Sequence, residues 1–375
     1  MTLTDDQRLL QDTVRPFMAD EGAIKKQLRH WRDTGCSDGF GHELWKQFGE
    51  LGLTGILIPE AQGGAGLGAV EAGVVLEEIG RNLTPSPFLT TAVASVRALQ
   101  GSAHAERWFP GIIAGEAIAA LAVDEGKHHD PSHIATEARR SGNGFVLSGA
   151  KQFAVHGSSA DVILIAARTA GSPGETDGLT LFAVEKNAKG LEIDNVMLAD
   201  SNSAARLKLD KVEVDADAVV GEVDGGWAPL SRALNAGRAG AAAELVGIAA
   251  GASEMTFEYL KQRKQFGRLI GEFQALQHRA AHLYGEIEIA RAAALKAAQL
   301  LDAGDPRAEL FVSIAKAKAA RTSALAVQEG VQMHGGIGMT DEHDIGLYMK
   351  REAVLSELFG SPRFHAARVA ELSGY

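Results

Sequence analysis

The sequence predicts an α+β fold that is mostly α, with an N-terminal helical domain, a middle β-barrel or β-sandwich domain and a C-terminal four-helix bundle. Two observations support this prediction. Apolar residues recur every three or four positions toward both ends of the chain, whereas short apolar runs separated by turn residues fill its middle. A chain of 375 residues has room for three such domains, which we expect at residues 1–118, 119–226 and 227–375.

The N-terminal domain is expected to be helical because two stretches have an apolar stripe at helical spacing. The stripes consist of Leu44, Phe48 and Leu51, and of Ala72, Val75, Leu76 and Ile79. A glycine-rich loop at residues 63–68 separates them. Its glycines lack the spacing of a dinucleotide-binding loop and no strand–turn–helix unit surrounds them, so we interpret this loop as a turn.

The middle domain is expected to be a β structure. The segment 138–148 has the pattern of a hairpin, with Ser141-Gly142-Asn143-Gly144 between two extended arms. Residues 161–167 and 179–184 are apolar runs of strand length, and residues 207–214 alternate apolar and polar side chains. Short strands with turns between them are typical of a small barrel or sandwich.

The C-terminal domain is expected to be a bundle of long helices. One face of the segment 276–301 steps by three and four through Leu276, Ala280, Leu283, Ile287, Ala290, Ala294, Ala297 and Leu301. A long Ala-rich helix cannot bury such a stripe alone, so the pattern predicts neighbouring helices and a subunit interface.

Composition excludes some classes of function. The net charge of −11 argues against nucleic acid or an anionic membrane as the main partner. The one cysteine, Cys36, excludes an intrachain disulfide and fits a reducing cytosol. The first residues have neither the basic nor the apolar region of a signal peptide, and Glu244 interrupts the apolar stretch 239–252. We therefore expect a cytoplasmic protein without a membrane span.

Five motifs occur in order along the chain. They are residues 51–67 with Ile58-Pro59-Glu60, Ser148-Gly149-Ala150-Lys151, residues 212–227, Arg263-Lys264-Gln265-Phe266-Gly267 followed by Phe273-Gln274, and Gln332-Met333-His334-Gly335-Gly336-Ile337-Gly338. Together they resemble the signatures of the acyl-CoA dehydrogenase family over the whole chain. The resemblance implies FAD as the cofactor and an acyl-CoA as the substrate.

In that family FAD lies at a dimer interface, and the resemblance implies which residues hold it. Arg263, with Phe266 in the same motif, would reach the pyrophosphate of the partner's FAD, because a guanidinium is always charged and offers paired donors. Gly335 and Gly336 would let backbone N–H groups approach the same pyrophosphate. Gln332 would hydrogen-bond near the adenine.

The resemblance implies two further contacts with FAD. Gln274 matches the glutamine of the family's F-Q pair, with Gln277 on the same helix as the alternative polar contact. Phe153 matches the aromatic residue of a W-I-T triplet that covers the flavin ring. The rest of the triplet is Ala154 and Val155 here, so the hydroxyl group that would bond flavin N5 is missing.

The expected catalytic carboxylate is also missing. Dehydrogenation of an acyl thioester needs a glutamate to take the α-proton while the flavin takes the β-hydride. The family's two positions for this glutamate correspond to Phe359 and to Gly237, next to Arg238. Glu357 is near the first position, and Glu244 is about 10 Å along a helix from the second. For both we expect a solvated or ion-paired role, so no catalytic residue is predicted in this chain.

The loop that holds the flavin in the family differs as well. The family's T-E-P-x-x-G-S-D motif corresponds to residues 123–130, which include His128, His129 and Asp130. Adjacent histidines in a polar loop are usually solvated and no second ligand pair follows at suitable spacing, so no metal site is predicted. His156 is an alternative base for a monooxygenase-like relative.

The family residues that are missing are those that would bind this chain's own flavin and act as its base. The residues that would contact a partner's flavin are present. We interpret the chain as the non-catalytic subunit of an α2β2 FAD-dependent acyl-CoA dehydrogenase, whose partner supplies the glutamate and whose electrons leave to an electron-transfer flavoprotein. Residues 80–87 resemble a stretch frequent in bacterial enzymes of steroid side-chain degradation. The alternatives are a self-sufficient homotetramer with a relocated base, a pseudoenzyme that binds acyl-CoA or a partner without turnover, and a flavin-dependent monooxygenase.

Overall fold

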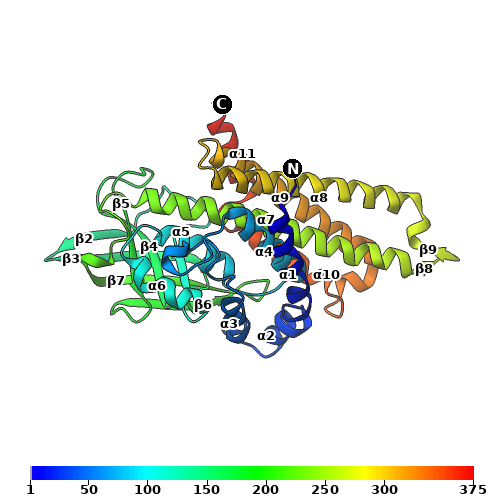
Figure 1. Ribbon diagram of the computed structural model, residues 1–375, viewed down its shortest axis with the longest axis horizontal. Coiled ribbons are helices and arrows are strands. Elements are labelled where there is room, and N and C mark those ends of the chain that lie inside the picture. Colours follow the sequence, from blue (N-terminus) through cyan, green and yellow to red (C-terminus); the bar gives the residue numbers. More distant parts are fainter. Residues whose placement is uncertain (1) are drawn as a thin grey trace. The chain divides into compact units, whose positions relative to one another are not determined.

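The computed structural model describes residues 2–375 and divides the chain into two compact units. The first comprises Met1–His30, Ala69–Pro85 and Arg238–Tyr375, and the second comprises Trp31–Gly68 and Ser86–Gly237. Figure 1 shows helices toward both ends of the chain and a curled sheet in its middle, which confirms the predicted fold class.

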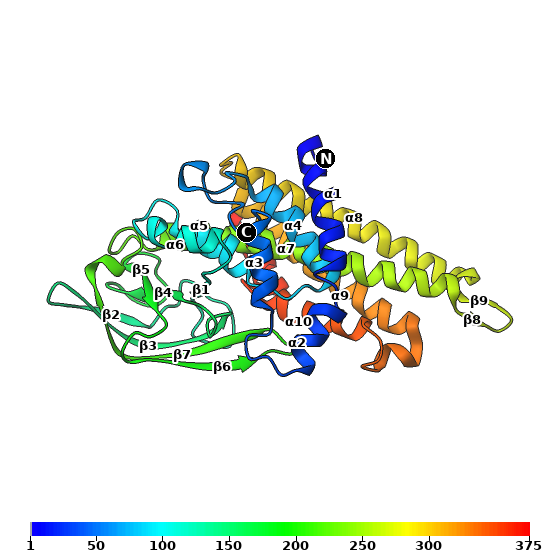
Figure 2. The same ribbon diagram turned by 60° about the horizontal axis from the view of Figure 1, so that its bottom comes forward.

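The first unit is a bundle of helices. They are α1 (Asp5–Asp20), α4 (Ala69–Asn82), α7 (Trp227–Gln262, in this unit from Arg238 onward), α8 (Gln274–Asp302), α9 (Ala308–His334), α10 (Ile345–Glu357) and α11 (Pro362–Leu372). Figures 1 and 2 show α8 and α9 side by side along most of their length. The short strands β8 (Lys264–Gln265) and β9 (Arg268–Leu269) form a hairpin between α7 and α8. A π-helical turn, η1 (Lys25–Arg29), and the short α2 (His30–Asp33) follow α1.

The apolar stripe predicted for residues 276–301 faces the core of this bundle. Leu283 and Ile287 of α8 are buried against Ala249 of α7 and Ala326 of α9. Small side chains on the neighbouring helices allow this close approach, so the stripe is buried by helices that are distant in sequence.

Helices α4 and α7 meet backbone to backbone. A Cβ added to Gly80 of α4 would overlap the carbonyl oxygen of Glu244 on α7, and a Cβ added to Gly247 of α7 would overlap the carbonyl oxygen of Glu77 on α4. Only glycine permits this separation of the two helices. The contact fixes α4 against the helix that includes Arg238 and Glu244.

The second unit contains a seven-stranded sheet in the order β1-β4-β2-β3-β7-β6, with β5 paired to β4. The strands are β1 (Ala119–Ala122), β2 (Glu137–Ser141), β3 (Gly144–Val155), β4 (Val162–Arg168), β5 (Leu179–Glu185), β6 (Leu191–Met197) and β7 (Ser203–Asp215). Strands β1 and β2 run parallel to β4, and the other pairs are antiparallel. Figure 2 shows the long strands β3, β7 and β6 beside one another.

The sequence predicted β2, β3, β4, β5 and β7 of this sheet, whereas β1 and β6 were not predicted. Ser141 pairs with Gly144 across a two-residue turn, as the hairpin pattern predicted. Gly142 has a φ of 57°, which a tight hairpin turn requires. The runs at 161–167, 179–184 and 207–214 correspond to β4, β5 and β7.

The second unit also contains the helices α3 (His42–Glu50), α5 (Val96–Leu99) and α6 (His104–Ile113), the π-helix η3 (Phe88–Ser95) and the part of α7 before Arg238. Trp45, Phe48 and Phe88 are fully buried among them, and the rings of Phe48 and Phe88 are 6.2 Å apart between centroids. Leu51, the last member of the first predicted stripe, is 46% exposed because α3 ends at Glu50.

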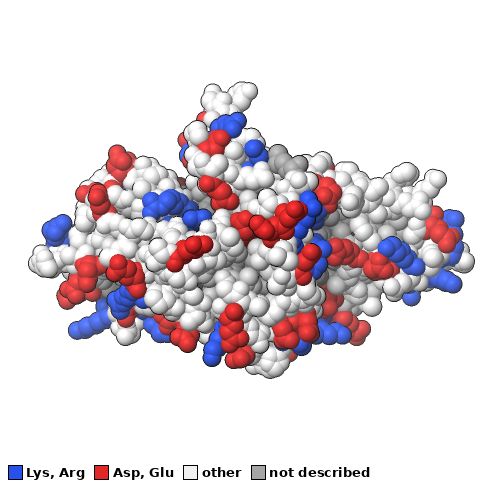
Figure 3. Space-filling view, in the orientation of Figure 1, with Lys and Arg blue, Asp and Glu red and all other residues white. Residues whose placement is uncertain are grey.

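Among residues 2–375, no helix is both long enough and apolar enough to cross a bilayer. On the face drawn in Figure 3, Lys and Arg side chains are interspersed with Asp and Glu side chains. Charges of both signs are thus mixed on this face rather than gathered into one basic surface.

Candidate cofactor-binding site

Arg263 stands at the end of α7, immediately before the hairpin of β8 and β9. Its backbone N–H donates to the carbonyl of Tyr259 and its carbonyl accepts from the N–H of Ile270, both at 2.9 Å. These bonds hold the backbone, whereas the side chain is exposed and its guanidinium has no hydrogen-bond or ion-pair partner among residues 2–375. A charged group on a fixed backbone, with all its donors open, is suited to bind an anion from outside the chain.

The hairpin after Arg263 presents an aromatic ring to solvent. Phe266 and Gly267 form its two-residue turn, with φ values of 53° and 82°. Phe266 is 91% exposed, and its ring stands edge-on to Phe273 with 6.2 Å between centroids. An apolar ring this exposed is typical of a surface that another molecule covers.

The two candidate glutamines of α8 have different surroundings. Gln277 Nε2 donates to the carbonyl of Gly271 at 2.8 Å, which ties the first turn of α8 to the preceding loop. Gln274 is the first residue of the helix and is exposed, and its carboxamide has no hydrogen bond within the described chain. Of the two, Gln274 is therefore the better candidate for a ligand contact.

The loop after α9 leaves its backbone open. Gly335 has a φ of 67° and begins the 3-10 turn η6 (Gly335–Met339). A Cβ added at Gly335 or Gly336 would meet no atom within 4 Å, and both residues are exposed. Packing inside the chain does not require glycine at position 336, but close approach of a phosphate to the backbone does. Gln332, on the last turn of α9, is also exposed.

A buried histidine brings these two segments together. The rings of His334 and Tyr259 are 4.5 Å apart between centroids, so the end of α9 lies against the end of α7. Arg263 follows Tyr259 by one helical turn, and Gly335 follows His334 directly. The structure thus places two predicted contacts, 72 residues apart in sequence (263 to 335), in adjoining segments.

His334 also has a polar atom that the chain leaves unsatisfied. Its Nδ1 donates to the carbonyl of Gly330 at 2.7 Å, whereas its buried Nε2 has no hydrogen-bond partner among the described residues. Burial lowers the pKa of His334, and His343, whose ring lies 4.3 Å away, lowers it further. The lowered pKa favours a neutral ring beside the glycine loop, with Nε2 buried. Nothing in the sequence pattern marks His334 as a site residue, although it lies inside the Gln332–Gly338 motif.

Phe359, at one predicted position of the missing base, belongs to a rigid turn. Its side chain is buried and its φ is 61°. Its carbonyl accepts a hydrogen bond from Arg238 Nε at 3.1 Å and another from His365 Nε2 at 3.2 Å. Arg238, which follows Gly237 at the other predicted position, therefore contacts the backbone of this turn.

Glu244 forms a buried ion pair. Its side chain is 2% exposed, and its Oε1 accepts from Nε and Nη2 of Arg351 at 2.9 and 2.6 Å. This two-bond contact fastens α7 to α10 and occupies the carboxylate. Glu357, at the end of α10, is exposed to solvent. Glu244 is therefore engaged inside the chain, whereas the Glu357 carboxylate faces solvent two residues from the predicted position.

Replacing Arg351 by Met is expected to lower the free energy of unfolding by about 3–5 kcal/mol, because the Glu244 carboxylate stays buried without its partner. Denaturant titration followed by circular dichroism measures the loss. Arg279→Met is the matched control: it breaks the more exposed pair of Arg279 and Glu329 and should cost less than about 1 kcal/mol. Equal losses in the two variants would contradict the structural role of Glu244.

A buried lysine donates hydrogen bonds to the backbone just before the turn at Phe359. Lys316 of α9 is fully buried, and its Nζ donates to the carbonyls of Leu355 and Ser356 at 3.0 and 2.9 Å. Burial lowers the pKa of Lys316 to about 7 and raises the pKa of Glu352 to about 6. Neither residue belongs to a recognisable motif, so neither was predicted from the sequence.

Lys316 should make the stability of the chain depend on pH. Its pKa of about 7 in the folded chain is below the ordinary value of 10.5, so between these pH values the unfolded chain binds the extra proton. The free energy of unfolding should therefore rise with pH across this window, by at most about 1.4 kcal/mol per pH unit from this group. Denaturation at several pH values measures the slope. The Lys316→Met chain should lack this contribution, and an unchanged slope would contradict it.

In the second unit, Lys151 of the Ser148–Lys151 motif closes the loop between β1 and β2. It is fully buried, and its Nζ donates to Glu125 Oε1 at 2.7 Å and to the carbonyl of Val123 at 3.1 Å. Burial lowers the pKa of Lys151 to about 8, although the neighbouring Glu125 opposes that shift. Glu125 also accepts from the N–H of Thr136 at 2.9 Å. The motif thus positions the loop that corresponds to the family's flavin-holding segment.

The histidines of that loop make local contacts. His129 Nδ1 donates to the carboxylate of Asp124 at 2.9 Å, and Asp130 accepts from Ser132 Oγ at 2.9 Å. His128 is exposed. Within residues 2–375, no three His, Cys, Asp or Glu side chains are grouped so that they could hold a metal ion.

Phe153 lies where β3 bulges between residues 151 and 154, and His156 directly follows the end of β3; both have positive φ values, 55° and 60°. Phe153 is half-buried. His156 is 3% exposed, and its Nδ1 shares a hydrogen bond of 2.9 Å with Thr90 Oγ1 while its ring stands edge-on to Phe40. His156 is thus packed into the second unit by contacts on two sides.

Three family models together match almost the whole chain. They are the N-terminal domain of acyl-CoA dehydrogenase over residues 4–116, its middle domain over residues 119–212 and its C-terminal domain over residues 224–373. Among curated proteins, the cyclohex-1-ene-1-carbonyl-CoA dehydrogenase of Geobacter metallireducens is 31% identical over 366 residues, which cover 95% of this chain and 94% of that protein.

Solved structures agree with this match. A variant of the Tcur3481-Tcur3483 steroid ACAD is 30% identical, with a TM-score of 0.88 over 99% of this chain and 98% of that chain. The ChsE4-ChsE5 complex from Mycobacterium tuberculosis is 25% identical, with a TM-score of 0.89 over 100% of this chain and 99% of that chain.

Proposed function

The chain belongs to the acyl-CoA dehydrogenase family, whose members depend on FAD, and on this premise we propose that it is the non-catalytic subunit of a heteromeric dehydrogenase. It completes the FAD site of a partner subunit that has the catalytic glutamate. The complex removes hydrogen from the α and β carbons of an acyl-CoA with a steroid-derived acyl chain. Electrons then leave to an electron-transfer flavoprotein.

The observation behind this proposal is that this chain offers no free carboxylate where the base is expected. Gly237 has no side chain, and Phe359 is buried in a turn. The nearby Glu244 is engaged by Arg351. A base must reach the α-carbon of the substrate, and none of these groups is free to do so. The proton is therefore taken by a residue of the partner.

The residues that would hold the partner's FAD fit that group. Arg263 has an unengaged guanidinium, which suits a pyrophosphate because it can donate two parallel hydrogen bonds. The open backbone of Gly335 and Gly336 allows close approach of the phosphates. Gln332 and Gln274 offer exposed carboxamides to the rest of the cofactor. When bound, FAD supplies the acceptor for the β-hydride, and these residues bind and orient it.

The related structures support a complex of unlike chains. Two of them are named by two components each, the Tcur3481-Tcur3483 steroid ACAD and the ChsE4-ChsE5 complex. The first of these names also supports a steroid-derived acyl chain as the substrate class. An α2β2 assembly would agree with these two-component structures. It would also contain one catalytic glutamate for each pair of unlike chains, as we propose.

The test is the FAD content and turnover of the chain alone and after co-expression with a homologous subunit encoded nearby. We expect little FAD and no turnover from the lone chain, and about one FAD per pair of chains with acyl-CoA turnover from the complex. Stoichiometric FAD with turnover in the lone chain would indicate a self-sufficient homotetramer. A flavin-free, inactive complex would indicate a pseudoenzyme, and NADH-linked oxygen consumption would indicate a monooxygenase.

A further inference from the structure

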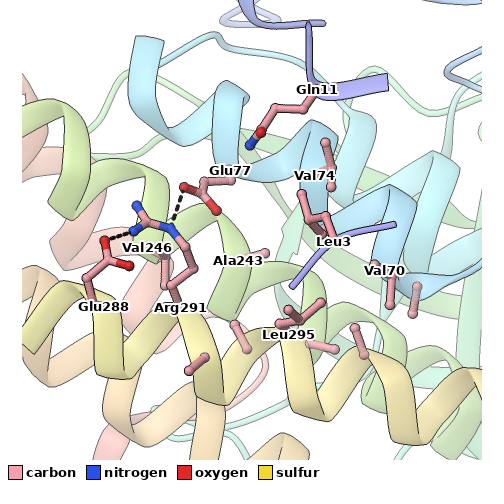
Figure 4. A pocket seen from close by; sticks show the side chains of 16 residues that line it. Leu3, Gln11, Val70, Val74, Glu77, Ala243, Val246, Glu288, Arg291 and Leu295 are labelled. Carbon is pink, nitrogen blue, oxygen red and sulfur yellow. Dashed lines mark hydrogen bonds and ion pairs between the residues drawn. The ribbon is translucent and has the colours of Figure 1, made fainter. Parts of the chain in front are cut away.

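The first unit contains a cavity that the proposed FAD contacts do not use. Its volume is about 190 Å³, and α4, α7 and α8 form its walls. Figure 4 shows Val70 and Val74 of α4, Ala243 of α7 and Leu295 of α8 around it, with Leu3 from the segment before α1 reaching into the same space. These walls are aliphatic and several of their side chains are small, whereas Gln11, Glu77, Glu288 and Arg291 line one end of the cavity.

The cavity is on a different side of α7 from the position of the missing base. Ala239, Ala243 and Val246 line it and follow one another at helical spacing. At about 100° per residue, these three lie roughly 180–240° around the helix from Gly237. A molecule in the cavity therefore faces the side of α7 that points away from the expected catalytic position.

Charged groups gather at one end of the cavity and neutralise one another. Arg291 Nε donates to Glu77 Oε1 at 3.0 Å, and Arg291 Nη1 pairs with Glu288, as the dashed lines in Figure 4 show. Glu77 also meets Arg81 Nη2 at 3.4 Å. Because the carboxylates already occupy these guanidinium groups, an anion entering the cavity would find no free cation at this end among residues 2–375.

Gln11 of α1 adds one open polar group at the same end. Figure 4 shows its carboxamide directed toward Glu77. It has no hydrogen bond to any residue from 2 to 375, and it can both donate and accept. A ligand with a single hydroxyl or carbonyl group could satisfy it, whereas the rest of the ligand would meet only aliphatic walls.

We propose that this cavity binds one small uncharged molecule, either an apolar ring or a short hydrocarbon with at most one neutral polar group. An enclosed aliphatic cavity of roughly 150 Å³ is known to take up benzene or xenon, and the present cavity is partly open, so a ligand can enter it. The present cavity has about 190 Å³, so a single ring with a small substituent fits it. The inference is independent of the proposed subunit role.

Toluene and benzoate, which share a ring and differ in charge, are the probes. Saturation-transfer NMR on the 375-residue chain should detect toluene and show benzoate binding at least about tenfold more weakly. A xenon-pressurised crystal should show xenon between Val74 and Leu295. Ala243→Leu fills the cavity and should abolish the xenon site and weaken toluene about tenfold or more, whereas Ala281→Leu, at an exposed position of α8, should change neither.

Three results would overturn the proposal: no toluene binding to the unchanged chain, equal affinity for benzoate, or unchanged toluene affinity in Ala243→Leu. If that variant does not fold, Leu295→Ala replaces it, since it enlarges the cavity from another wall. It should bind naphthalene more tightly than the unchanged chain does, and equal or weaker naphthalene binding would contradict the site.

Discussion

Replacing Arg263 by Met should lower the affinity of the complex for FAD by about 100-fold and reduce its turnover at limiting FAD accordingly. The guanidinium offers paired, charge-assisted hydrogen bonds to a pyrophosphate, and losing two of them at about 1.5 kcal/mol each amounts to about 3 kcal/mol. The fold should be unaffected, because this side chain is exposed and has no partner within residues 2–375.

FAD titration of the purified complex, followed by the change in flavin fluorescence, measures this effect. Lys264→Met is the matched control, since it removes an exposed positive charge from the next residue. It should weaken FAD by no more than about threefold, as expected for a screened charge. Arg263→Lys keeps the charge but loses the planar fork, so it should recover only part of the affinity. Equal effects of Arg263→Met and Lys264→Met would contradict a direct contact.

Replacing Gly247 by Val should lower the stability of the first unit by more than about 4 kcal/mol or prevent its folding. A Cβ at this position would overlap the carbonyl oxygen of Glu77 and would lie 2.8 Å from the carbonyl carbon of Glu77 and 2.9 Å from the nitrogen of Arg81. These are backbone atoms of α4, which cannot rotate aside. The helices would have to separate, which exposes their apolar faces.

Gly73→Ala is the control for this change. Gly73 also lies on α4, but its added Cβ would stand 3.6 Å from the Cβ of Ala243, an ordinary contact. Because alanine is favoured over glycine inside a helix by about 1 kcal/mol, this variant should be as stable as the unchanged chain or more stable. Denaturant unfolding compares the two, and a Gly247→Val chain of unchanged stability would show that α4 and α7 do not need their close contact.

The sequence alone was sufficient to predict the three-part architecture and the family. Helix and strand periodicity are local properties, so the stripe on α8 and the strands β4, β5 and β7 were visible without a structure. The order of the motifs identified the acyl-CoA dehydrogenase family, which the family models confirm. The absence of a glutamate at positions 237 and 359, where the resemblance places the base, was also visible, because it is a fact of the sequence.

Only the tertiary structure decided which polar side chains are engaged. Glu244 forms an ion pair with Arg351, which is 107 residues away in sequence. The local sequence pattern around either residue does not predict this pair. Lys316 sits in an Ala-rich helix, where a solvated lysine and a buried one look alike, yet it is fully buried. The contact of His334 with Tyr259 and the cavity between α4, α7 and α8 likewise depend on how distant helices pack. Burial and ion pairing arise from neighbours that are far apart in sequence, so periodicity and motif spacing do not contain them.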